Sequence, residues 1–577
     1  MLRMYPYIKN YKKDIILALF FLFIEVVAEM AFPKFMAKVV GEGVNSGDIG
    51  YISQVGFTMI AVAVLSLLSG IGTVRYSART GVGFAAELRR GVFDKVQTFS
   101  FANIDEFSVG SLTTRLTNDI TQLQSTVVTG LRILARAPFM LIFSLVMSIQ
   151  ISPKLAIILA VIMPILVISL AYIIYLAVPL FKKMQKKLDG LNSNIQENLT
   201  NIRVVKSFVR ETYEIEKFRM ANRDLLEASI KAMHVVIINM PLMMFMMNAA
   251  IVAVVYFGGN MVLQGDLDVA EMTAFINYIF IVLMSLMMLS LMFIMLARAS
   301  ASYKRICEIF DTKVDLVDEQ GAQDIANVCG EITFQDVNFR YAGSAEENVL
   351  ENICFTVRPG EVIAIIGSTG AGKSSLMQLI PRLYDVTAGK ILLDGKDIRQ
   401  YTIPSLRKQI GMVLQKNTLF SGTIRDNLKW GYENASEMEI VAAAKAAQAH
   451  DFILGFANGY DTLLEQGGAN LSGGQKQRLC IARAILKKPA ILILDDSTSA
   501  VDTVTEKKIR QGLTNLLHRT TMFIIAQRIS AVRDVDKILV MREGKIVASG
   551  SHQELLEKSV EYQEIYDSQN QQAEEGL

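Results

Sequence analysis

Tryptophan and histidine are scarce in this chain of 577 residues, and neither charge is in clear excess. Lys and Arg (58) almost balance Asp and Glu (56), which leaves a formal net charge of +2. Such a balance gives no bulk electrostatic reason to expect a nucleic-acid partner. The single Trp and the sparse basic clusters agree with that. We therefore expect no nucleic acid among its partners.

Cysteine is also rare. The four cysteines fall in the second half of the chain and none has the spacing of a metal-ligand pair. A disulfide framework needs an oxidising compartment. We predict free thiols in the cytosol for Cys307, Cys329, Cys354 and Cys480.

Charge is missing above all from the first half. The chain is 51% apolar and 20% charged. Up to about Ala297 it repeatedly runs for about 18 or more residues with few charges, whereas the part after Glu331 reads as a soluble domain. A bilayer core of ~30 Å needs about 20 apolar residues in a helix. Six stretches qualify, at approximately 14–36, 53–74, 130–151, 155–178, 234–263 and 270–297.

The N-terminus, 1–13, is basic and precedes the first apolar run. That run is longer than a signal peptide and has no small-x-small cleavage pattern at its end. We interpret 1–13 as a cytosolic N-terminal elbow and 14–320 as a transmembrane domain that begins with an uncleaved span.

The connections between the six stretches differ in charge. The short ones at 41–51 and 258–271 carry acids and no Lys or Arg, although Lys154 in a third is a mild counterexample. The long ones at 75–115 and 182–231 are basic. Positive residues stay on the cytoplasmic side of a membrane. The sequence predicts a multi-pass protein of a cell membrane, of bacterial type, with both termini in the cytoplasm.

The two basic connections show apolar residues at helical spacing, for example Leu188, Leu191 and Ile195. We predict that spans two to five continue as helices into the cytosol. Two extra cytosolic domains are the alternative. The segments 101–107 and 208–213 lie near the midpoints and are predicted to be short helices that press on the soluble domain.

Polar residues within the apolar stretches mark a possible substrate cavity. Glu25 and Glu29 are four residues apart and share one helix face, and intramembrane acids are expensive. They would bind cationic substrates or line an aqueous cavity; the alternative is a packing contact with another helix. The last two spans are rich in Met, which suits a pocket for varied ligands but is more often simple packing. The further candidates are Met243, Met247, Asn248, Asn277 and Met288.

Two motifs of the soluble domain predict a nucleotide site. A strand at 361–366 runs into G-x-x-x-x-G-K-S before a helix predicted from Leu376 onward, which is the context that a phosphate-binding loop requires. A second strand ends in Asp495 and Asp496. Lys373 would reach the β/γ-phosphates, and Ser374 and Asp495 would hold Mg²⁺. The predicted phosphate-binding residues are Gly367, Ser368, Thr369, Gly370, Ala371, Gly372, Lys373, Ser374 and Ser375.

A third motif contains glycines before a helix, which offer N–H donors to an anion. It comprises Leu471, Ser472, Gly473, Gly474 and Gln475. The chain already has one phosphate cradle, so a second is useful only if it serves the nucleotide of another subunit.

With these motifs in place, the whole chain resembles a half-transporter of the ABC exporter family with the type IV fold: a six-helix transmembrane domain fused to an α/β P-loop ATPase domain with a helical subdomain, here 331–568, and a polar tail at 569–577. The resemblance implies ATP and Mg²⁺ as cofactors and a dimer in which each ATP lies between the P-loop of one chain and the signature of the other. It also implies that Tyr341 stacks on adenine, that Gln415 is the Q-loop residue near Mg²⁺, and that Ser499–Asp502 form the D-loop.

Two positions depart from the family pattern. The usual general base after the Mg²⁺ aspartate is Glu, and here it is Asp496, one methylene shorter. The switch histidine is replaced by Gln527, which can hydrogen-bond a phosphate but carries no charge. A misplacement of about 1 Å can cost about 10²-fold in rate. We predict that the chain's own site binds ATP and hydrolyses it poorly, as in heterodimeric bacterial multidrug exporters.

The leading hypothesis is ATP-driven export of hydrophobic or amphipathic compounds, drugs included, with a non-identical partner chain that carries the usual Glu and His. Lipid or peptide export stays open, and so does a nucleotide-gated regulatory or channel-like subunit. The intact signature argues against the last of these. The polar tail after Ser568 is expected to be disordered.

Overall fold

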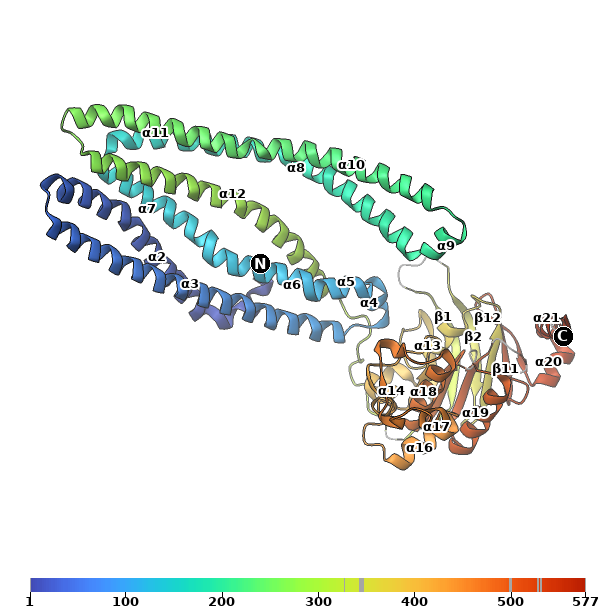
Figure 1. The fold of residues 1–577 in the computed structure, drawn as a ribbon. Helices are drawn as coiled ribbons and strands as arrows, with labels where there is room; N and C mark the ends of the chain where they lie inside the picture. The colour runs from blue at the N-terminus through green and yellow to red at the C-terminus, as the bar shows by residue number, and fades with distance from the viewer. Residues whose placement is uncertain are drawn as a thin grey trace. The chain divides into compact units, whose positions relative to one another are not determined.

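The computed structural model describes residues 2–325, 327–341, 347–497, 501–526, 529 and 532–575. The chain forms two compact units (Figure 1). The first comprises Met1–Gln97 and Val109–Thr312, and the second comprises Thr98–Ser108 and Lys313–Leu577. All four cysteines are free, as predicted.

The first unit is entirely helical in the residues described. Six of its helices are long and apolar enough to cross a membrane, which confirms the six-span prediction. After two short 3₁₀ turns around α1 (Tyr5–Ile8), the helices are α2 (Lys12–Lys38), α3 (Ile49–Gln97), α5 (Val109–Thr114), α6 (Ile120–Thr129), α7 (Ala135–Ile151), α8 (Pro153–Thr200), α9 (Ile202–Ser207), α10 (Glu211–Ile237), α11 (Asn239–Leu263) and α12 (Val269–Asp311).

Several of these helices are longer than a bilayer requires. A membrane-spanning helix needs about 20 residues, whereas α3 has 49 residues and α8 has 48. Short π-helical segments join α5, α6 and α7 into one helical run from Val109 to Ile151. The predicted helical extensions are therefore present, and α12 continues beyond its predicted end at 297 to Asp311.

Local capping determines where the membrane helices turn. The Ser152 hydroxyl accepts a hydrogen bond from the N–H of Leu155 (3.3 Å) at the start of α8. Asp268 and Glu271 form a capping box at the start of α12. Lys154, the lysine that disturbed the charge pattern of the short loops, pairs with Asp266 at 3.3 Å. Its charge is thus partly neutralised by an acid of another short loop.

The helices α2 and α3 pack closely because small residues alternate with aromatic ones. The rings of Phe21 and Tyr76 stack with centroids 5.8 Å apart. A Cβ at Gly72 would lie only 2.6 Å from Phe21 Cγ, so glycine is what admits that ring.

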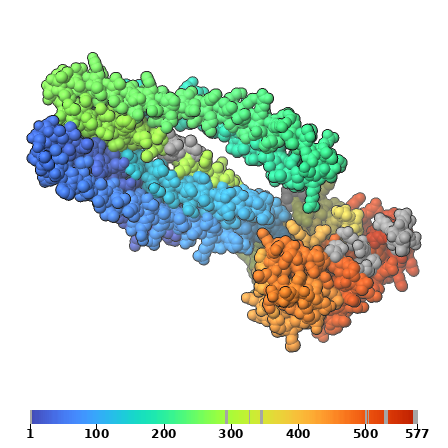
Figure 2. Space-filling model, in the orientation of Figure 1, coloured from blue at the N-terminus to red at the C-terminus, as the bar shows by residue number. Residues whose placement is uncertain are grey.

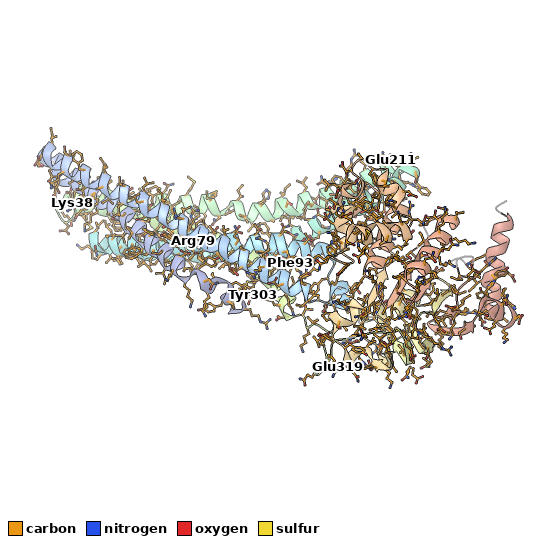
Figure 3. The ribbon with its side chains drawn as sticks, turned by 90° about the horizontal axis from the view of Figure 1, so that it is seen from below. Lys38, Arg79, Phe93, Glu211, Tyr303 and Glu319 are labelled. Carbon is orange, nitrogen blue, oxygen red and sulfur yellow. The ribbon has the colours of Figure 1, made fainter. Side chains whose placement is uncertain are left out.

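Arg79 and Phe93 lie further along α3, away from the end of the unit that carries Lys38 (Figure 3).

The α8–α10 hairpin forms an arm whose two helices run side by side, with α9 at its tip (Figures 1 and 2). The predicted short helix at 208–213 is wrong in position. The helix α9 spans Ile202–Ser207, and the chain then turns at Val209, which has a positive φ of 51°. The 208–213 segment instead contains this turn and the start of α10.

A buried carboxylate joins the π-helical segment between α5 and α6 (Arg115–Asp119) to α12. Asp119, only 4% exposed in its side chain, accepts hydrogen bonds from Nε (2.7 Å) and Nη2 of Arg305 and from Ser302 Oγ (2.8 Å). Arg115 strengthens the same joint through Glu308, at 2.8 Å. These charge-assisted bonds hold together helices that are nearly 200 residues apart in sequence (a separation of 186 for Asp119 and Arg305).

The second unit is an α/β domain. Its main sheet has the strand order β12-β11-β3-β10-β9-β6, in which β12 alone is antiparallel to its neighbour among the pairs described. A second sheet has the order β2-β1-β4-β5. The strands are β1 (Ile332–Phe339), β2 (Leu350–Val357), β3 (Val362–Gly367), β4 (Ala388–Leu393), β5 (Lys396–Asp397), β6 (Ile410–Val413), β9 (Ile491–Asp495), β10 (Thr521–Ile525), β11 (Lys537–Arg542) and β12 (Lys545–Gly550), with a small pair, β7 (Gly422–Thr423) and β8 (Leu463–Leu464).

Helices complete the second unit. Those used below are α4 (Phe101–Glu106), α13 (Lys373–Leu379), α18 (Gly473–Leu486), α19 (Thr503–Leu516) and α21 (Val560–Glu575); the others are α14 (Ile403–Lys408), α15 (Ile424–Lys429), α16 (Glu437–Ala446), α17 (His450–Leu454) and α20 (His552–Lys558). α13 begins at Lys373, three residues before the predicted Leu376, because Gly372 serves as its N-cap.

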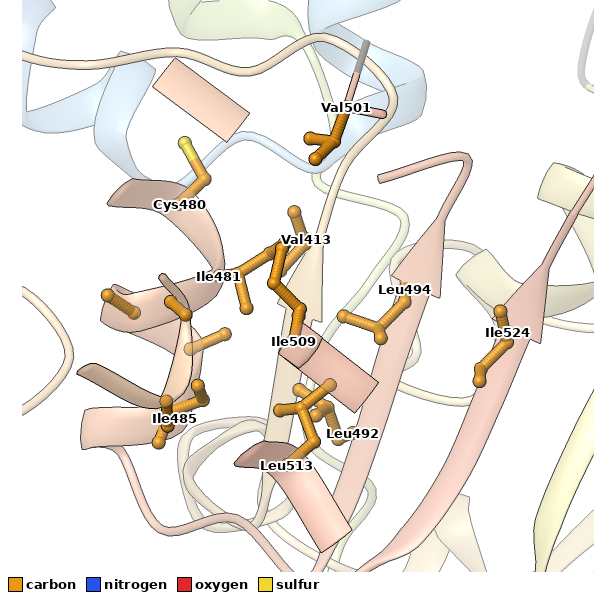
Figure 4. Packing of buried hydrophobic residues seen from close by; sticks show 14 of the residues in the cluster. Val413, Cys480, Ile481, Ile485, Leu492, Leu494, Val501, Ile509, Leu513 and Ile524 are labelled. Atoms are coloured by element: carbon orange, nitrogen blue, oxygen red, sulfur yellow. The ribbon is translucent and has the colours of Figure 1, made fainter. Parts of the chain in front are cut away.

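Apolar residues of the main sheet and of α18 and α19 build the larger core. Ile481 and Ile485 of α18 face Leu492 and Leu494 of β9, with Ile509 of α19 beside them (Figure 4). Each of these side chains is at most 3% exposed. The core fixes the carboxyl ends of β3 and β9, where the sequence places the two nucleotide motifs.

The predicted disorder of the tail is wrong as far as Glu575. The helix α21 runs through the expected boundary at Ser568. Tyr562 explains why, because it is fully buried and its hydroxyl hydrogen-bonds His552 Nδ1 at 2.6 Å. A polar C-terminal segment is thus anchored by one aromatic side chain near its start.

The Asp119 joint makes a stability prediction. In Asp119→Asn the neutral amide cannot compensate the positive charge of Arg305. We expect the free energy of unfolding to fall by about 2 kcal/mol. The measurement is the melting temperature of the detergent-solubilised protein. Asp224→Asn, which breaks the exposed pair between Asp224 and Lys187, is the matched control and should melt like the parent. Equal melting of all three proteins would contradict the prediction.

Candidate nucleotide site and membrane ion cluster

The P-loop conformation depends on glycine at three positions. Gly367, Gly370 and Gly372 have φ values of 153°, 86° and 89°, in the range that L side chains rarely adopt. A Cβ at Gly367 would lie 2.1 Å from the carbonyl oxygen of Met541, and one at Gly372 would lie 2.8 Å from Leu350 Cδ2. The loop can therefore present backbone N–H groups inward at the start of α13.

Lys373 folds back over this loop. Its Nζ donates hydrogen bonds to the carbonyl oxygens of Gly367 (2.9 Å) and Ser368 (2.7 Å). Burial lowers the pKa of Lys373, and the nearby Asp495 and Asp496 carboxylates oppose that shift. The ammonium group is thus held at the mouth of the cradle, close to where a phosphate oxygen would need it.

A hydroxyl and a carboxylate converge beside the loop. Ser374 Oγ donates to Asp495 Oδ1 at 3.1 Å. Asp495 ends β9, is 3% exposed, and has its pKa raised mainly by burial. A buried carboxylate next to a hydroxyl is the donor set that Mg²⁺ takes together with phosphate oxygens. These two residues fit the predicted metal site, and bound Mg²⁺ would neutralise phosphate charge there.

Asp496 follows with an unusual backbone. Its φ is +48°, and its carbonyl oxygen accepts a hydrogen bond from Gln477 Nε2 at 3.2 Å. Asp496 and Gln415, which comes just after β6, both line the same cavity as the P-loop. Gln527 lies outside the described residues, as do Ser499 and Ala500 of the predicted D-loop.

The cavity has a volume of about 860 Å³. It contains Gly367–Ser375, Gln415, Asp495 and Asp496, so the structure brings these predicted residues together. Sequence reasoning missed one wall: Glu561, Glu564 and Gln569 of α21 also line the cavity. No motif marks those residues, and only the docking of α21 places them there.

Tyr341 is joined to the P-loop helix. Its hydroxyl lies 2.9 Å from Ser375 Oγ and 3.4 Å from Gln378 Oε1. Its ring meets those of Phe339 and Tyr384 edge-on, with centroids 4.8 and 5.1 Å away. The aromatic that the resemblance assigns to the base is therefore held by α13 and by two neighbouring rings, although it does not itself line the cavity.

The signature motif is separate from this cavity. Among the described residues, Leu471–Gln475 do not contribute to its walls. Ser472 is the N-cap of α18 and forms a capping box with Gln475, whose Oε1 accepts the N–H of Ser472 at 2.9 Å. The N-terminus of α18, with Gly473 and Gly474, faces elsewhere and can offer its N–H groups to a different ligand.

An ion cluster lies among the membrane helices. Arg136 of α7 pairs with Glu25 at 2.8 Å and also with Glu29, and Thr73 of α3 donates to Glu25 at 3.2 Å. The predicted acids thus share one face, as expected, but the partner Arg136 was missed because it lies 107 and 111 residues away. Two acids of one helix thus contact one guanidinium of another, which is the packing alternative of the sequence analysis.

The other cavity candidates divide into two groups. Met243 and Met247 pack partly buried against the cluster formed by α8, α11 and α12, which is the packing alternative. Asn248 and Asn277 are exposed on their helices, and Met288 is half-buried. The structure of one chain does not gather all five into a single pocket.

The chain also matches known protein families. Residues 15–286 match the family model of the ABC transporter transmembrane region, and residues 350–499 match the ABC transporter family model. It is 40% identical over 563 residues to the uncharacterized ABC transporter ATP-binding protein YfiB of Bacillus subtilis (strain 168), which covers 98% of this chain and 97% of the relative. The chain is an ABC half-transporter.

Relatives with more specific names are similar over most of their lengths. The half-transporter is 34% identical to an ATP-dependent lipid A-core flippase of Syntrophus aciditrophicus (strain SB), over 85% of this chain and 81% of that one. It is 33% identical to YgaD, a putative multidrug export ATP-binding/permease protein of Bacillus subtilis (strain 168), over 99% of both chains.

The fold agrees with a solved exporter. A bacterial Atm1-family ABC exporter with ATP bound superposes with a TM-score of 0.81, at 27% identity, over 97% of this chain and 98% of the other. The protein is therefore an ABC exporter: a multi-pass membrane protein with the fused ATPase domain of an ATP-hydrolysing transporter.

The P-loop geometry predicts the effect of one methyl group. Gly372→Ala places a Cβ against Leu350 and Val349 at a positive φ. Strain of this kind is on the order of 1–2 kcal/mol. We therefore expect the variant to bind ATP about tenfold more weakly. Photolabelling of the half-transporter with 8-azido-ATP measures it. Gly360→Ala, at a φ of 79° with nothing within 4 Å, is the control. Equal labelling of both variants would contradict the prediction.

The ion cluster makes a second prediction. Arg136→Met leaves two carboxylates without their cation and should cost about 1–3 kcal/mol of stability, less than a fully buried pair because Arg136 is 28% exposed. Adding Glu25→Gln and Glu29→Gln removes those charges and should restore much of the lost melting temperature. If the triple variant melts no higher than Arg136→Met, unpaired charge is not the cause.

Proposed function

We propose that this half-transporter is one subunit of a heterodimeric, ATP-driven exporter of hydrophobic and amphipathic compounds. Its own P-loop site binds MgATP and hydrolyses it weakly or not at all. Its signature, Leu471–Gln475, completes the catalytic site of a non-identical partner. The observation that carries this proposal is Asp496 at the position of the general base.

Asp496 is a poor replacement for glutamate on geometric grounds. It lines the cavity beside Asp495, but one missing methylene withdraws its carboxylate by roughly one C–C bond, about 1.5 Å. General bases contribute about 10²–10⁴-fold to a rate only when they reach the attacking water. Gln527 at the switch position supports the same conclusion from the sequence, because glutamine carries no positive charge.

The ATP-binding residues retain everything else that nucleotide binding needs. Lys373 would contact the phosphates, Ser374 and Asp495 would hold Mg²⁺ with Gln415 nearby, and Tyr341 would stack on the base. A site that binds ATP without turning it over remains closed longer than a hydrolysing site. Such a subunit would keep the dimer assembled while the partner's site works.

Two surfaces support a second chain. The tip of the α8–α10 arm exposes apolar side chains, including Phe208 (73% exposed) and Val209 (79%). In the second unit, an apolar cavity of about 310 Å³ is lined by Phe420 and Trp430, whose rings stack 4.1 Å apart. Large exposed apolar groups of this kind mark interaction sites. We propose that the tip of each chain docks in this cavity of its partner.

The substrate class rests on the membrane helices. Glu25 and Glu29 place two acids beside the single Arg136 in an apolar region, which favours a cationic or amphipathic ligand over an anionic one. Asn248 and Asn277, exposed on apolar helices, would face the cavity between the two chains rather than lipid, and the flexible Met243, Met247 and Met288 would line it. The named multidrug relative points the same way.

Lipid export is the second candidate, favoured by the likeness to the named lipid A-core flippase. A lipid A core carries phosphate, so its transport calls for cations in the cavity. The excess acid around Arg136 argues against that substrate. A nucleotide-gated channel-like subunit is less well supported, since such a chain has no need of an intact signature motif.

The decisive test of the unequal sites is ATP hydrolysis. We expect negligible activity from the purified chain alone and strong activity with its partner. Asp496→Asn should change the activity of the pair by less than about twofold, because the base position contributes little here. The corresponding substitution of the partner's glutamate is the control and should abolish turnover. Robust hydrolysis by this chain alone would overturn the proposal.

A further inference from the structure

Tyr384 occupies a position between two functional elements that sequence reasoning treated separately. It lies in the loop that follows α13, and its ring lies edge-on to Tyr341, with centroids 5.1 Å apart and an interplanar angle of 90°. On its other side it meets the ring of Phe101 in α4, at 6.1 Å. One aromatic side chain therefore contacts both the proposed base-stacking residue and the short helix α4.

The contact with α4 is also polar. The Tyr384 hydroxyl donates a hydrogen bond of 2.6 Å to Asp105 Oδ2. Burial raises the pKa of Tyr384, and the Asp105 carboxylate raises it further, so the phenol stays protonated and remains a donor. Bonds from a hydroxyl to a carboxylate are among the stronger hydrogen bonds in proteins.

The loop that carries Tyr384 is held firmly. The neighbouring Arg382, 3% exposed, binds Asp385 through two nitrogens (2.7 and 3.0 Å) and the carbonyl oxygen of Val317 (3.3 Å). Arg407 in turn donates to the carbonyl oxygen of Arg382 at 2.6 Å. The loop backbone that carries Tyr384 is thus held from several sides.

Tyr341 continues the series towards the phosphates. Its hydroxyl contacts Ser375 and Gln378 of α13, and Ser375 lines the nucleotide cavity. The contacts thus run without a break from Asp105 through Tyr384 and Tyr341 to the P-loop helix. All of these residues belong to the second unit.

We infer that Tyr384 is a positioning residue that couples the seating of α4 to the binding of the adenine base at Tyr341. It touches no nucleotide itself. By holding the edge of the Tyr341 ring, it pre-orients that ring for stacking, and its own orientation is fixed by Asp105. This inference rests on the proposed binding of ATP with its base on Tyr341.

The coupling must be reciprocal, because a linkage between two binding events has one free energy. If a seated α4 favours binding of the base, then binding of the base must stabilise α4 in its seat. The phosphates alone should not have this effect, since they contact the P-loop rather than Tyr341. A ligand with a triphosphate and no base therefore separates the proposed coupling from general closure of the site.

The test uses the full-length half-transporter, assembled with its partner in nanodiscs. Photolabelling of this chain by 8-azido-ATP is competed by either MgATP or magnesium tripolyphosphate, which gives a half-protecting concentration for each. Tyr384→Phe removes only the hydrogen bond, and Asp105→Asn weakens the same bond from the other side. The neighbouring exposed acid of α4 provides the matched control, Glu106→Gln.

We expect Tyr384→Phe and Asp105→Asn each to raise the half-protecting concentration of ATP by about two- to fivefold, the range that one hydrogen bond supplies. The value for tripolyphosphate should stay unchanged, and so should both values in Glu106→Gln. The double variant should be no weaker than either single one, since both substitutions act on the same bond. Equal effects on ATP and tripolyphosphate, or none on ATP, would overturn the inference.

A second readout follows amide hydrogen exchange in 101–106. ATP should slow exchange there in the parent protein and in Glu106→Gln, but much less in Tyr384→Phe; tripolyphosphate should not slow it. A purely structural role of Tyr384 would change exchange equally with either ligand. Tyr341→Ala separates the proposed stacking from the inference on Tyr384. If Tyr341→Ala binds ATP as the parent protein does, the proposed stacking is wrong. If Tyr341→Ala weakens ATP binding and Tyr384→Phe does not, only the inference on Tyr384 is wrong.

Discussion

A backbone amide in the hydrocarbon of a bilayer finds no water, and this constraint determines the form of the N-terminal unit. Only helices and closed barrels satisfy every N–H and C=O internally. The chain answers with six helical runs, and it turns between them at capped positions such as Ser152 and Asp268. Because the helices are already formed at the membrane surface, their extension beyond it costs little further free energy. The helices α3 and α8 accordingly continue to 49 and 48 residues.

Long helices need lateral contacts, and here ion pairs supplement the apolar packing between them. Asp119, which directly precedes α6, connects that region to α12 through Arg305, and Arg136 connects α7 to Glu25 and Glu29 of α2. Apolar packing cannot distinguish one helix from another in lipid, since lipid tails are equally apolar. Paired charges do distinguish them, because an unpaired partner is costly in the membrane. The same chemistry that orders the helices also provides the two acids on which substrate selection is proposed to depend.

The sequence predicted what is local and missed what is tertiary. Apolar length identified six spans, and the glycine pattern around Gly367–Ser374 placed the phosphate cradle, because a bilayer and a phosphate each demand a fixed pattern over neighbouring residues. The ion pairs of Arg136 were not predicted because no local sequence pattern around Arg136 indicates contact with α2. The position of α9 was missed because the helix breaks at Asn201, and a polar residue inside a helical pattern gives a weak signal. The continuation of α21 beyond Ser568 was missed because the helix is anchored by the burial of Tyr562, which composition does not reveal.

The backbone at Asp496 has a consequence of its own. A φ of +48° belongs to the left-handed region, where most L residues pay on the order of 1–2 kcal/mol and aspartate is tolerated better than glutamate. An exporter that hydrolyses ATP with a glutamate at this position must hold that glutamate in the left-handed conformation. The conformational free energy is then the cost of a faster hydrolysis step. In a subunit released from that duty, selection on folding alone favours the shorter acid. Under the proposed function, one substitution both removes hydrolysis and relaxes the main chain, so a dimer with unequal sites is easy to reach by mutation and hard to reverse.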